Sequence, residues 1–176
     1  MMRFFLLPVT LISILLVSCH RQVDFSSLEI RNDTVYLNND LFSGDAVESY
    51  GDSATKSERM YEKGLLEGAY IEYYPSGNLK SSGNYSDGMR QGEWTRYYEN
   101  GELYLKGSFS DDKKTGTWHY WYNNNQLEYE GEWKNDKQVG LWKSWYKDGS
   151  IHSEIHWKDG MQHGEEIKYH ENGKIR

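Results

Sequence analysis

The side chains best suited to chemistry are the histidines, and their spacing predicts no metal site. His152 and His156 lie four residues apart. On a β-strand this separates them by ~13 Å along one face, too far to share one ion. His119, His163 and His170 follow no common spacing. We interpret the histidines as exposed strand and turn residues and expect no metal or cofactor.

Glutamates are plentiful, but their pattern is that of a solvated strand face. Glu128, Glu130 and Glu132 occupy every second position of one segment. A glycosidase needs two opposed carboxyl groups ~5–9 Å apart in a cleft, and nothing indicates a cleft. The sequence also lacks a glycine-rich phosphate loop. We expect no catalytic residues and predict that the protein is not an enzyme.

Cys19 is the only cysteine, so the chain cannot form an intramolecular disulfide. It follows a leader, Met1–Ser18, that has a basic residue near its start, Arg3, and then an apolar run from Phe4 to Val17. That run is shorter than the ~20 residues of a membrane-spanning helix. Residues 1–18 are therefore predicted to be a signal peptide.

The end of the leader, Leu16-Val17-Ser18-Cys19, resembles the lipobox of bacterial lipoproteins. In that family the cysteine thiol is diacylated, the leader is cut just before the cysteine, and the new N-terminus is usually acylated too. Ser18 matches the small residue at the cleavage site. The resemblance implies a stable membrane anchor at Cys19, since two or three acyl chains hold where one is marginal. An ordinary secretory leader with a coincidental cysteine is the alternative.

The same resemblance implies a location in the cell envelope. His20 favours the outer membrane, because aspartate at this place suggests retention at the inner membrane. Residues 19–27 would be the lipidated cysteine and a short tether.

Composition indicates strands and turns. The 176 residues include 17 glycines but only 2 prolines, and 15% are aromatic. The net charge is −7 and no basic cluster is present, so nucleic acid is not expected as a partner.

Glycine recurs every 24 residues from Gly44 onwards, and the segments that it opens are similar to one another. Position 3 is aromatic in the four central segments, and position 18 is aromatic in every segment that reaches it. Such a period predicts an array of stacked units, here called copies, over residues 44–176. Residues 28–43 are predicted to form an N-terminal hairpin that caps it. The copies begin at Gly44, Gly68, Gly92, Gly116, Gly140 and, truncated, Gly164.

Each copy is predicted to be a β-hairpin with strands at positions 1–7 and 11–18. Asn-Gly or Asp-Gly at positions 8–10, as in Asn100-Gly101, favours a type I′ turn. Positions 20–22, such as Asp87-Gly88-Met89, supply the turn to the next copy. The predicted fold is all-β: an elongated, twisted, single antiparallel meander of tandem 24-residue hairpins.

Pairing across the first turn would place position 7 opposite 12, 6 opposite 13, 3 opposite 16 and 1 opposite 18. Positions 1, 3, 5, 7, 12, 14, 16 and 18 would then share the core face. We expect Trp94 to lie over Gly107, and Gly92 to leave space for Phe109. The residues expected to hold the core are Gly68, Gly92, Gly116, Gly140, Trp94, Trp118 and Trp142.

The segment Tyr129-x-Gly131-x-Trp133, followed by Gly140-x-Trp142, resembles the MORN repeat (membrane occupation and recognition nexus). The longer form G-x-W-x-x-[YW]-Y-x-x-G-x-L is similar to a bacterial variant whose members are commonly described as antitoxin-like. The resemblance covers about residues 41–176. It implies a repeat sheet that acts as a scaffold, a protein-binding platform or a membrane-proximal module.

The opposite face carries one aromatic residue per copy at position 6, ~10 Å apart along the sheet. Positions 4, 13, 15 and 17 around these residues vary, a composition typical of interaction surfaces. Cross-strand stacking that only stabilises the sheet is the alternative. The candidate binding face consists of Tyr73, Tyr97, Trp121, Trp145 and Tyr169.

These observations predict a lipid-anchored, non-catalytic scaffold that binds a partner protein, with antitoxin-like neutralisation as one role. A glycan or cell-wall binder is the second hypothesis, because tryptophan and tyrosine faces stack on sugars. Edge-to-edge self-association is a third, since Gly164–His170 lacks its usual second strand. Glu165, Glu166 and Lys168 would weaken such edge pairing.

Overall fold

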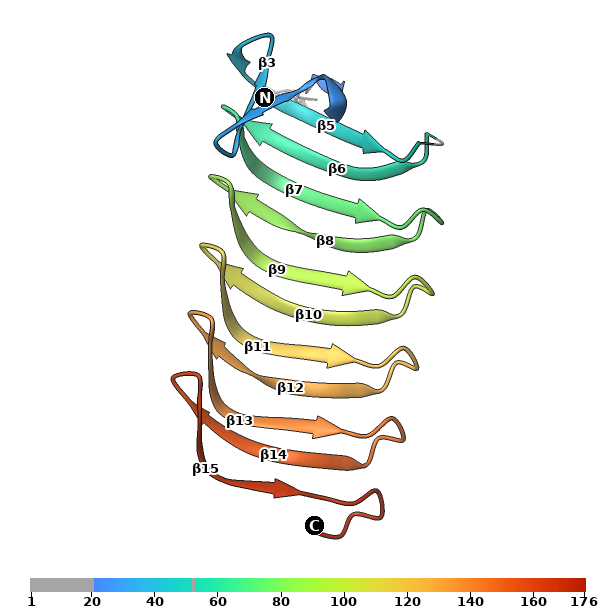
Figure 1. The fold of residues 1–176 in the computed structure, drawn as a ribbon, viewed down its shortest axis with the longest axis vertical. Coiled ribbons are helices and arrows are strands. Elements are labelled where there is room, and N and C mark those ends of the chain that lie inside the picture. Colours follow the sequence, from blue (N-terminus) through green and yellow to red (C-terminus); the bar gives the residue numbers. More distant parts are fainter. Residues whose placement is uncertain (1–20, 52) are drawn as a thin grey trace, which may run out of the picture.

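The computed structural model describes residues 21–51 and 53–176, and there the array forms one long sheet (Figure 1). Cys19 and the predicted leader lie outside the described residues. Within the described part, a 12-stranded sheet follows the order β1-β5-β6-β7-β8-β9-β10-β11-β12-β13-β14-β15, so neighbours in space are almost always neighbours in the chain. The predicted all-β meander of tandem hairpins is confirmed.

The strands of this sheet are β1 (Gln22–Asp24), β5 (Gly44–Ser49), β6 (Thr55–Glu62), β7 (Leu65–Tyr73), β8 (Leu79–Ser86), β9 (Met89–Tyr97), β10 (Leu103–Ser110), β11 (Lys113–Trp121), β12 (Leu127–Lys134), β13 (Lys137–Trp145), β14 (Ile151–Lys158) and β15 (Met161–Lys168).

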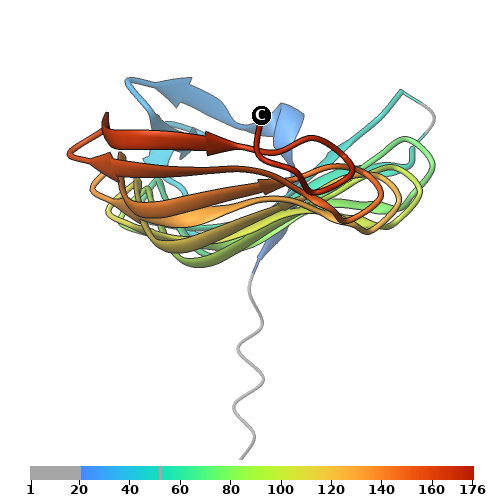
Figure 2. The same cartoon turned by 90° about the horizontal axis from the view of Figure 1, so that it is seen from below.

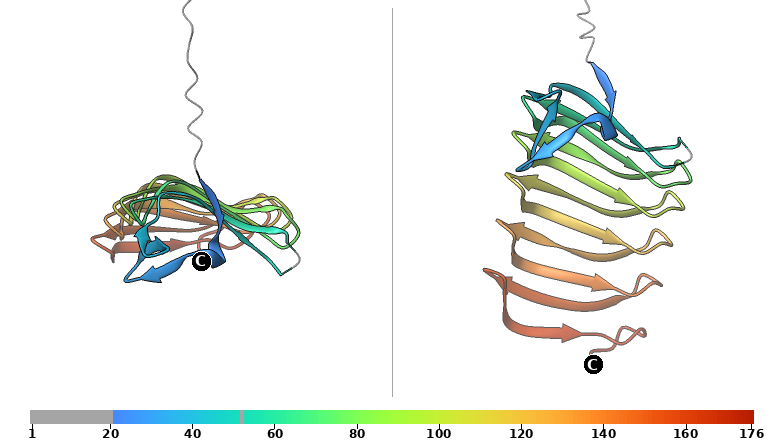
Figure 3. Two further views of the ribbon diagram at one scale, coloured as in Figure 1. Left: turned by 90° about the horizontal axis from the view of Figure 1, so that it is seen from above. Right: turned by 45° about the horizontal axis from the view of Figure 1, so that its top comes forward.

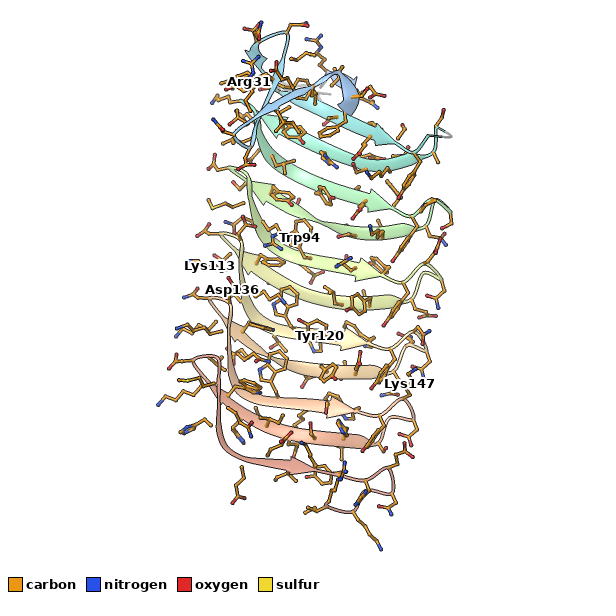
Figure 4. The ribbon with its side chains drawn as sticks, in the orientation of Figure 1. Arg31, Trp94, Lys113, Tyr120, Asp136 and Lys147 are labelled. Carbon is orange, nitrogen blue, oxygen red and sulfur yellow. The ribbon has the colours of Figure 1, made fainter. Side chains whose placement is uncertain are left out.

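The sheet is curved as well as twisted. Seen end on, the strands form a shallow trough with a concave and a convex face (Figure 2, Figure 3). A small sheet of β2 (Glu29–Arg31), β3 (Thr34–Leu37) and β4 (Asp40–Leu41) lies on the concave side at the N-terminal end. Trp94 and Tyr120 lie on the same concave face, near the middle of their strands (Figure 4).

The two turns of each copy differ, and only one is of type I′. At positions 20 and 21, Asp87 and Gly88 both have positive φ (49° and 78°), the condition for that turn. The predicted type I′ turn at positions 8–10 is wrong. In the copy that begins at Gly92, that loop has one left-handed residue, Gly101 (φ 87°), whose N–H donates to the Tyr98 carbonyl. The Tyr98 N–H in turn donates to the Glu102 carbonyl at 2.8 Å, which closes a three-residue loop with a glycine bulge.

The asparagine of this loop stabilises it through hydrogen bonds of its side chain. Asn100 Oδ1 accepts a hydrogen bond from the Glu102 N–H at 3.1 Å, and Nδ2 donates to the Asn123 carbonyl of the next copy at 3.4 Å. Asn100, which suggested a left-handed backbone, therefore fits this loop because its side-chain amide forms these hydrogen bonds.

The extra loop residue shifts the strand pairing beside the loop. Trp94 pairs with Gly107 and Gly92 with Phe109, as predicted. The predicted pairings of position 7 with 12 and of 6 with 13 are wrong, because Tyr97 at position 6 pairs with position 12. Residues that pair across an antiparallel ladder point to the same side. Position 12 therefore lies on the convex face, contrary to prediction.

Position 13 was expected on the convex face and lies on the concave one. The ring of Tyr104 is 5.0 Å from that of Tyr98 at position 7. In another copy His152 Nδ1 lies 3.1 Å from Oγ of Ser144, a buried residue that also bonds Ser153. The bulge at the loop thus exchanges position 12 for position 13 on the concave face.

The tryptophans at position 3 pack on the glycine of the preceding copy. A Cβ on Gly107 would lie 2.1 Å from the ring of Trp118, and one on Gly83 would lie 2.2 Å from Trp94. The expectation that Trp94 lies over Gly107 is therefore wrong in its partner, although their backbones pair. Each indole joins its copy to the one before.

Glycine at position 1 has a different reason. A Cβ on Gly92 or Gly116 would have nothing within 4 Å, so the predicted space for Phe109 does not explain them. Their φ angles of 66° and 67° are left-handed, which favours glycine. Gly92 lies where the β8–β9 register shifts. Figure 1 shows that β9 bends sharply near its start.

Part of the predicted tether belongs to a folded cap. β1 runs parallel to β5, with Val23 paired to Ala46, and the 3-10 helix η1 (Phe25–Ser27) follows it. The assignment of residues 22–27 to a tether is wrong, because the apolar Val23 and Phe25 pack against a buried cluster on the concave side. The buried residues of this cluster are Val35, Phe42, Ala46 and Tyr61.

Candidate binding faces

The concave face carries a stack of rings from positions 3 and 18, here called the concave ladder. Its rings meet edge to face, as for Phe109 and Trp118, whose centroids lie 5.1 Å apart at 90°. Each such contact stabilises the fold by ~0.5–1.5 kcal/mol beyond the contribution of the buried apolar area. Trp118 is only 2% exposed, and its indole N–H donates to the Ser108 carbonyl at 3.2 Å. The ladder consists of Tyr85, Trp94, Phe109, Trp118, Trp133 and Trp142.

Two cations from position 23 lie on this ladder. The Arg90 guanidinium is 3.9 Å from the ring centre of Phe109 and is paired with Asp112 at 2.6 Å. Lys114 Nζ lies 4.4 Å from the ring centre of Trp118 and 4.6 Å from that of Trp133. Burial lowers the pKa of Lys114.

Tyr120 at position 5 completes the surroundings of Lys114. Its hydroxyl lies 3.4 Å from Lys114 Nζ. Burial raises the pKa of Tyr120 to about 12, against a smaller opposing effect of Trp133. The buried Trp133 indole N–H has no hydrogen-bond partner within the described residues.

Two hollows of similar size lie on the concave face of the part of the chain that the structure describes. The earlier one, of about 460 Å³, has Arg90, Arg96 and Lys114 in its lining. The later one, of about 450 Å³, is lined by Trp142, Trp157, Tyr129, Gln138, Glu128 and Ser144, among others. Sequence reasoning did not distinguish these two places, because position 23 varies between copies.

The five predicted binding residues form one row on the opposite face, here called the convex row. Each is half-buried, so each exposes part of its ring. The Tyr73 hydroxyl donates to Glu58 at 3.2 Å, and the Tyr169 hydroxyl donates to Glu154 at 3.1 Å. Trp121 stacks with His119, with centroids 5.6 Å apart. The row therefore lies among the side chains of positions 4 and 15.

The glutamates of β12 do not all share one face, contrary to prediction. Glu130 lies on the convex face, 3.3 Å from His119 Nε2. Glu128 at position 13 lines the later hollow of the concave face. The bulge beside the loop reverses its side.

A family comparison matches five segments to the MORN repeat variant: residues 66–87, 90–111, 114–135, 138–159 and 162–176. The chain belongs to the MORN repeat variant family. MORN repeats commonly mediate protein or membrane interactions, and the family is generally a non-catalytic binding module. A comparison with curated proteins finds no match. The first hairpin, β5 and β6, precedes the matched segments and still pairs in the same sheet.

A tyrosine at position 7 links successive MORN copies, which the sequence did not reveal. The Tyr74 hydroxyl donates to the carbonyl of Tyr97, a convex-row residue of the next copy, at 2.8 Å. Asn124 Nδ2 adds a bond to the Lys147 carbonyl at the loop edge, 2.9 Å away. The loop edge of the MORN array is thus joined copy to copy.

The structure describes residues 21–51 and 53–176 of the MORN chain. In that part, no three His, Cys, Asp or Glu residues are grouped closely enough to hold a metal ion. No helix there has the length and apolar character needed to cross a membrane.

Proposed function

We propose that this protein is a lipid-anchored scaffold of the cell envelope that binds another protein through the convex row. The observation that carries the proposal is the repetition of one half-exposed aromatic side chain per copy on one face of the sheet. Aromatic residues within a polar surround are the usual anchors of protein interfaces.

The array is suited to this role because its spacing is fixed before a partner binds. The concave ladder, the position 7 tyrosines and the loop asparagines all join consecutive copies. A partner would then bind a preorganised surface, which reduces the entropy lost on association.

The anchor in this proposal is Cys19, the residue of the lipobox-like sequence. β1 begins at Gln22, and the three intervening steps of chain span at most ~10 Å. The cap would therefore lie close to the membrane and the later copies farther along the array. An antitoxin-like role requires that the partner be harmful when it is free.

The test is in-cell cross-linking followed by purification of the full-length chain from detergent extract. We expect a reproducible protein adduct with the natural chain and its loss in a Trp121→Ser, Trp145→Ser double variant. Thr117→Ser, on the same face and exposed, is the matched control and should keep the adduct. Recovery of the same adduct from the double variant, or of none from the natural chain, would refute the proposal.

A second measurement distinguishes a protein partner from a glycan partner. Titration with peptidoglycan fragments should leave tryptophan fluorescence unchanged. A saturable change that the double variant loses would replace the protein partner with a cell-wall glycan.

A further inference from the structure

The repeats allow one place on the concave face to be compared with its own copies. Position 23 faces the concave ladder in each copy, as its pairing with position 18 requires: Lys114 pairs with Phe109, and Gln138 with Trp133. The residues at this position, in chain order, are Leu66, Arg90, Lys114, Gln138 and Gln162. The cation of the second and third of these copies is thus replaced by a neutral amide in the fourth.

The surroundings of Lys114 show which group fits between the two aromatic residues at this position. Its ammonium lies between two indoles, 4.4 Å from the ring centre of Trp118 and 4.6 Å from that of Trp133. Indole faces attract cations through the ring quadrupole, more strongly when water is excluded. Arg90, by contrast, stacks on a single ring, that of Phe109. At position 23, the lysine thus lies between two tryptophans and the arginine on one phenylalanine.

One copy later the two tryptophans are kept and the ammonium is missing. Trp142 and Trp157 occupy positions 3 and 18, and both line the hollow of about 450 Å³ together with Gln138. Ser144 stands where the preceding copy has Tyr120, so the side chain at position 5 is smaller here. The pair of tryptophans is thus repeated in this copy, but the lysine is not.

The lining of this hollow carries an uncompensated negative group. Partial burial raises the pKa of Glu128, and the charge of Lys147 offsets this only partly. Within the described residues, Glu128 accepts no hydrogen bond or ion pair. The basic residue in the lining, Lys143, is itself paired with Glu154 at 3.5 Å. Charge complementarity therefore calls for a cation from outside the chain.

We propose that the hollow lined by Trp142, Trp157 and Glu128 binds the ammonium group of a lysine side chain from a partner protein. The lysine would take the place that Lys114 takes one copy earlier. Only the choice of a protein as the source rests on the proposed function, because the cation site itself stands on the comparison between copies.

The first experiment titrates the full mature chain with Nα-acetyl-lysine methylamide and follows the indole N–H signals by NMR. We expect saturable shifts confined to Trp142 and Trp157. Nα-acetyl-norleucine methylamide, which has the same stem without the charge, should give shifts at least tenfold weaker at equal concentration. Equal shifts with both probes, or none with the lysine probe, would overturn the proposal.

The second experiment fills the site from within. Gln138→Lys reproduces the arrangement of the preceding copy and should weaken binding of the lysine probe at least tenfold. Thr117→Lys adds the same charge to the convex face and should leave binding unchanged. Glu128→Gln, which adds no bulk, should weaken binding about threefold to tenfold. Wild-type affinity in both Gln138→Lys and Glu128→Gln would overturn the proposal.

The source of the cation is tested separately. Tetramethylammonium that binds at least tenfold more tightly than the lysine probe would make a free organic ammonium the ligand and overturn the assignment to lysine. A lysine-rich peptide should bind more tightly than the single-residue probe. The convex-row adduct described above depends on Trp121 and Trp145. Failure to recover this adduct from the natural chain, with binding of the lysine probe intact, would refute the proposed function and leave the cation site.

Discussion

The phenolic hydroxyl of Tyr98 donates a 2.7 Å hydrogen bond to the main-chain carbonyl of Trp121, one copy farther along the sheet. Tyr122 makes the same bond to Trp145, at 3.0 Å. The acceptors belong to the convex row, so the tyrosine of one copy fixes the backbone that carries the aromatic residue of the next. The same bond recurs at Tyr50, Tyr74 and Tyr146.

Replacing one of these tyrosines should cost stability without changing the fold. Tyr98→Phe removes a single hydroxyl and is expected to lower the free energy of unfolding by ~0.5–1.5 kcal/mol, the net contribution of one hydrogen bond. Tyr97→Phe is the matched control, because its hydroxyl donates no hydrogen bond within the described residues. Chemical denaturation of both variants measures the difference. Equal stabilities would mean that the bond does not join the copies.

A methyl group at position 16 should disturb the concave ladder. In Gly107→Ala the new Cβ would lie 2.1 Å from the Trp118 ring, so the indole must move. Overpacking of this kind costs ~1–3 kcal/mol. Trp118→Ala removes the clash but loses a buried ring, at ~3–5 kcal/mol. The double variant should therefore be less destabilised than the sum of the single variants, and strict additivity would place the indole elsewhere.

Alkaline pH should destabilise the sheet through its buried tyrosines. The pKa of Tyr120 rises from 10.0 to about 12 on folding, so the folded state holds its proton more tightly than the unfolded chain. The resulting stability is complete below pH 10 and is lost as pH rises towards 12. Tyr120→Phe should fall less steeply in stability between these values, with pH 8 as the reference for both proteins. Parallel curves would contradict the assigned burial effect.

The lipid anchor gives a prediction independent of the sheet. Mass spectrometry of the N-terminal peptide should find Cys19 at the first position, with its thiol diacylated. Cys19→Ser should release the protein from the membrane fraction and abolish labelling with a fatty-acid analogue. An unmodified, uncleaved Cys19 in the natural chain would refute the anchor.

The period of glycine and tryptophan was enough to predict the strand order, because each copy can bury its rings only against its neighbours. The stacking partners were harder to predict. The copies that begin at Gly92 and Gly116 both carry tryptophan at position 3 and glycine at position 16, so their sequence fits stacking within a copy and between copies equally well. The ends of the array held the missing signal: Ile155 occupies the glycine position where the next copy has Glu166 in place of tryptophan.

The details that sequence reasoning missed depend on single residues. Asn100-Gly101 fits a two-residue and a three-residue loop, and the difference moved position 13 to the other face. The apolar pattern of Val23 and Phe25 is too short to predict that β1 would pair with β5. The cation at Lys114 was hidden, because position 23 changes its chemistry from copy to copy.

The most direct test of a binding sheet is in-cell photo-crosslinking from positions within and outside the convex row of the same face. A photoreactive phenylalanine would replace the convex-row residues Tyr97, Trp121 and Trp145 one at a time, and the exposed position Thr117 as a control. The account predicts the same protein adduct from all three convex-row positions and none, or much less, from position 117. No adduct from any convex-row position in a folded, membrane-bound chain would contradict it.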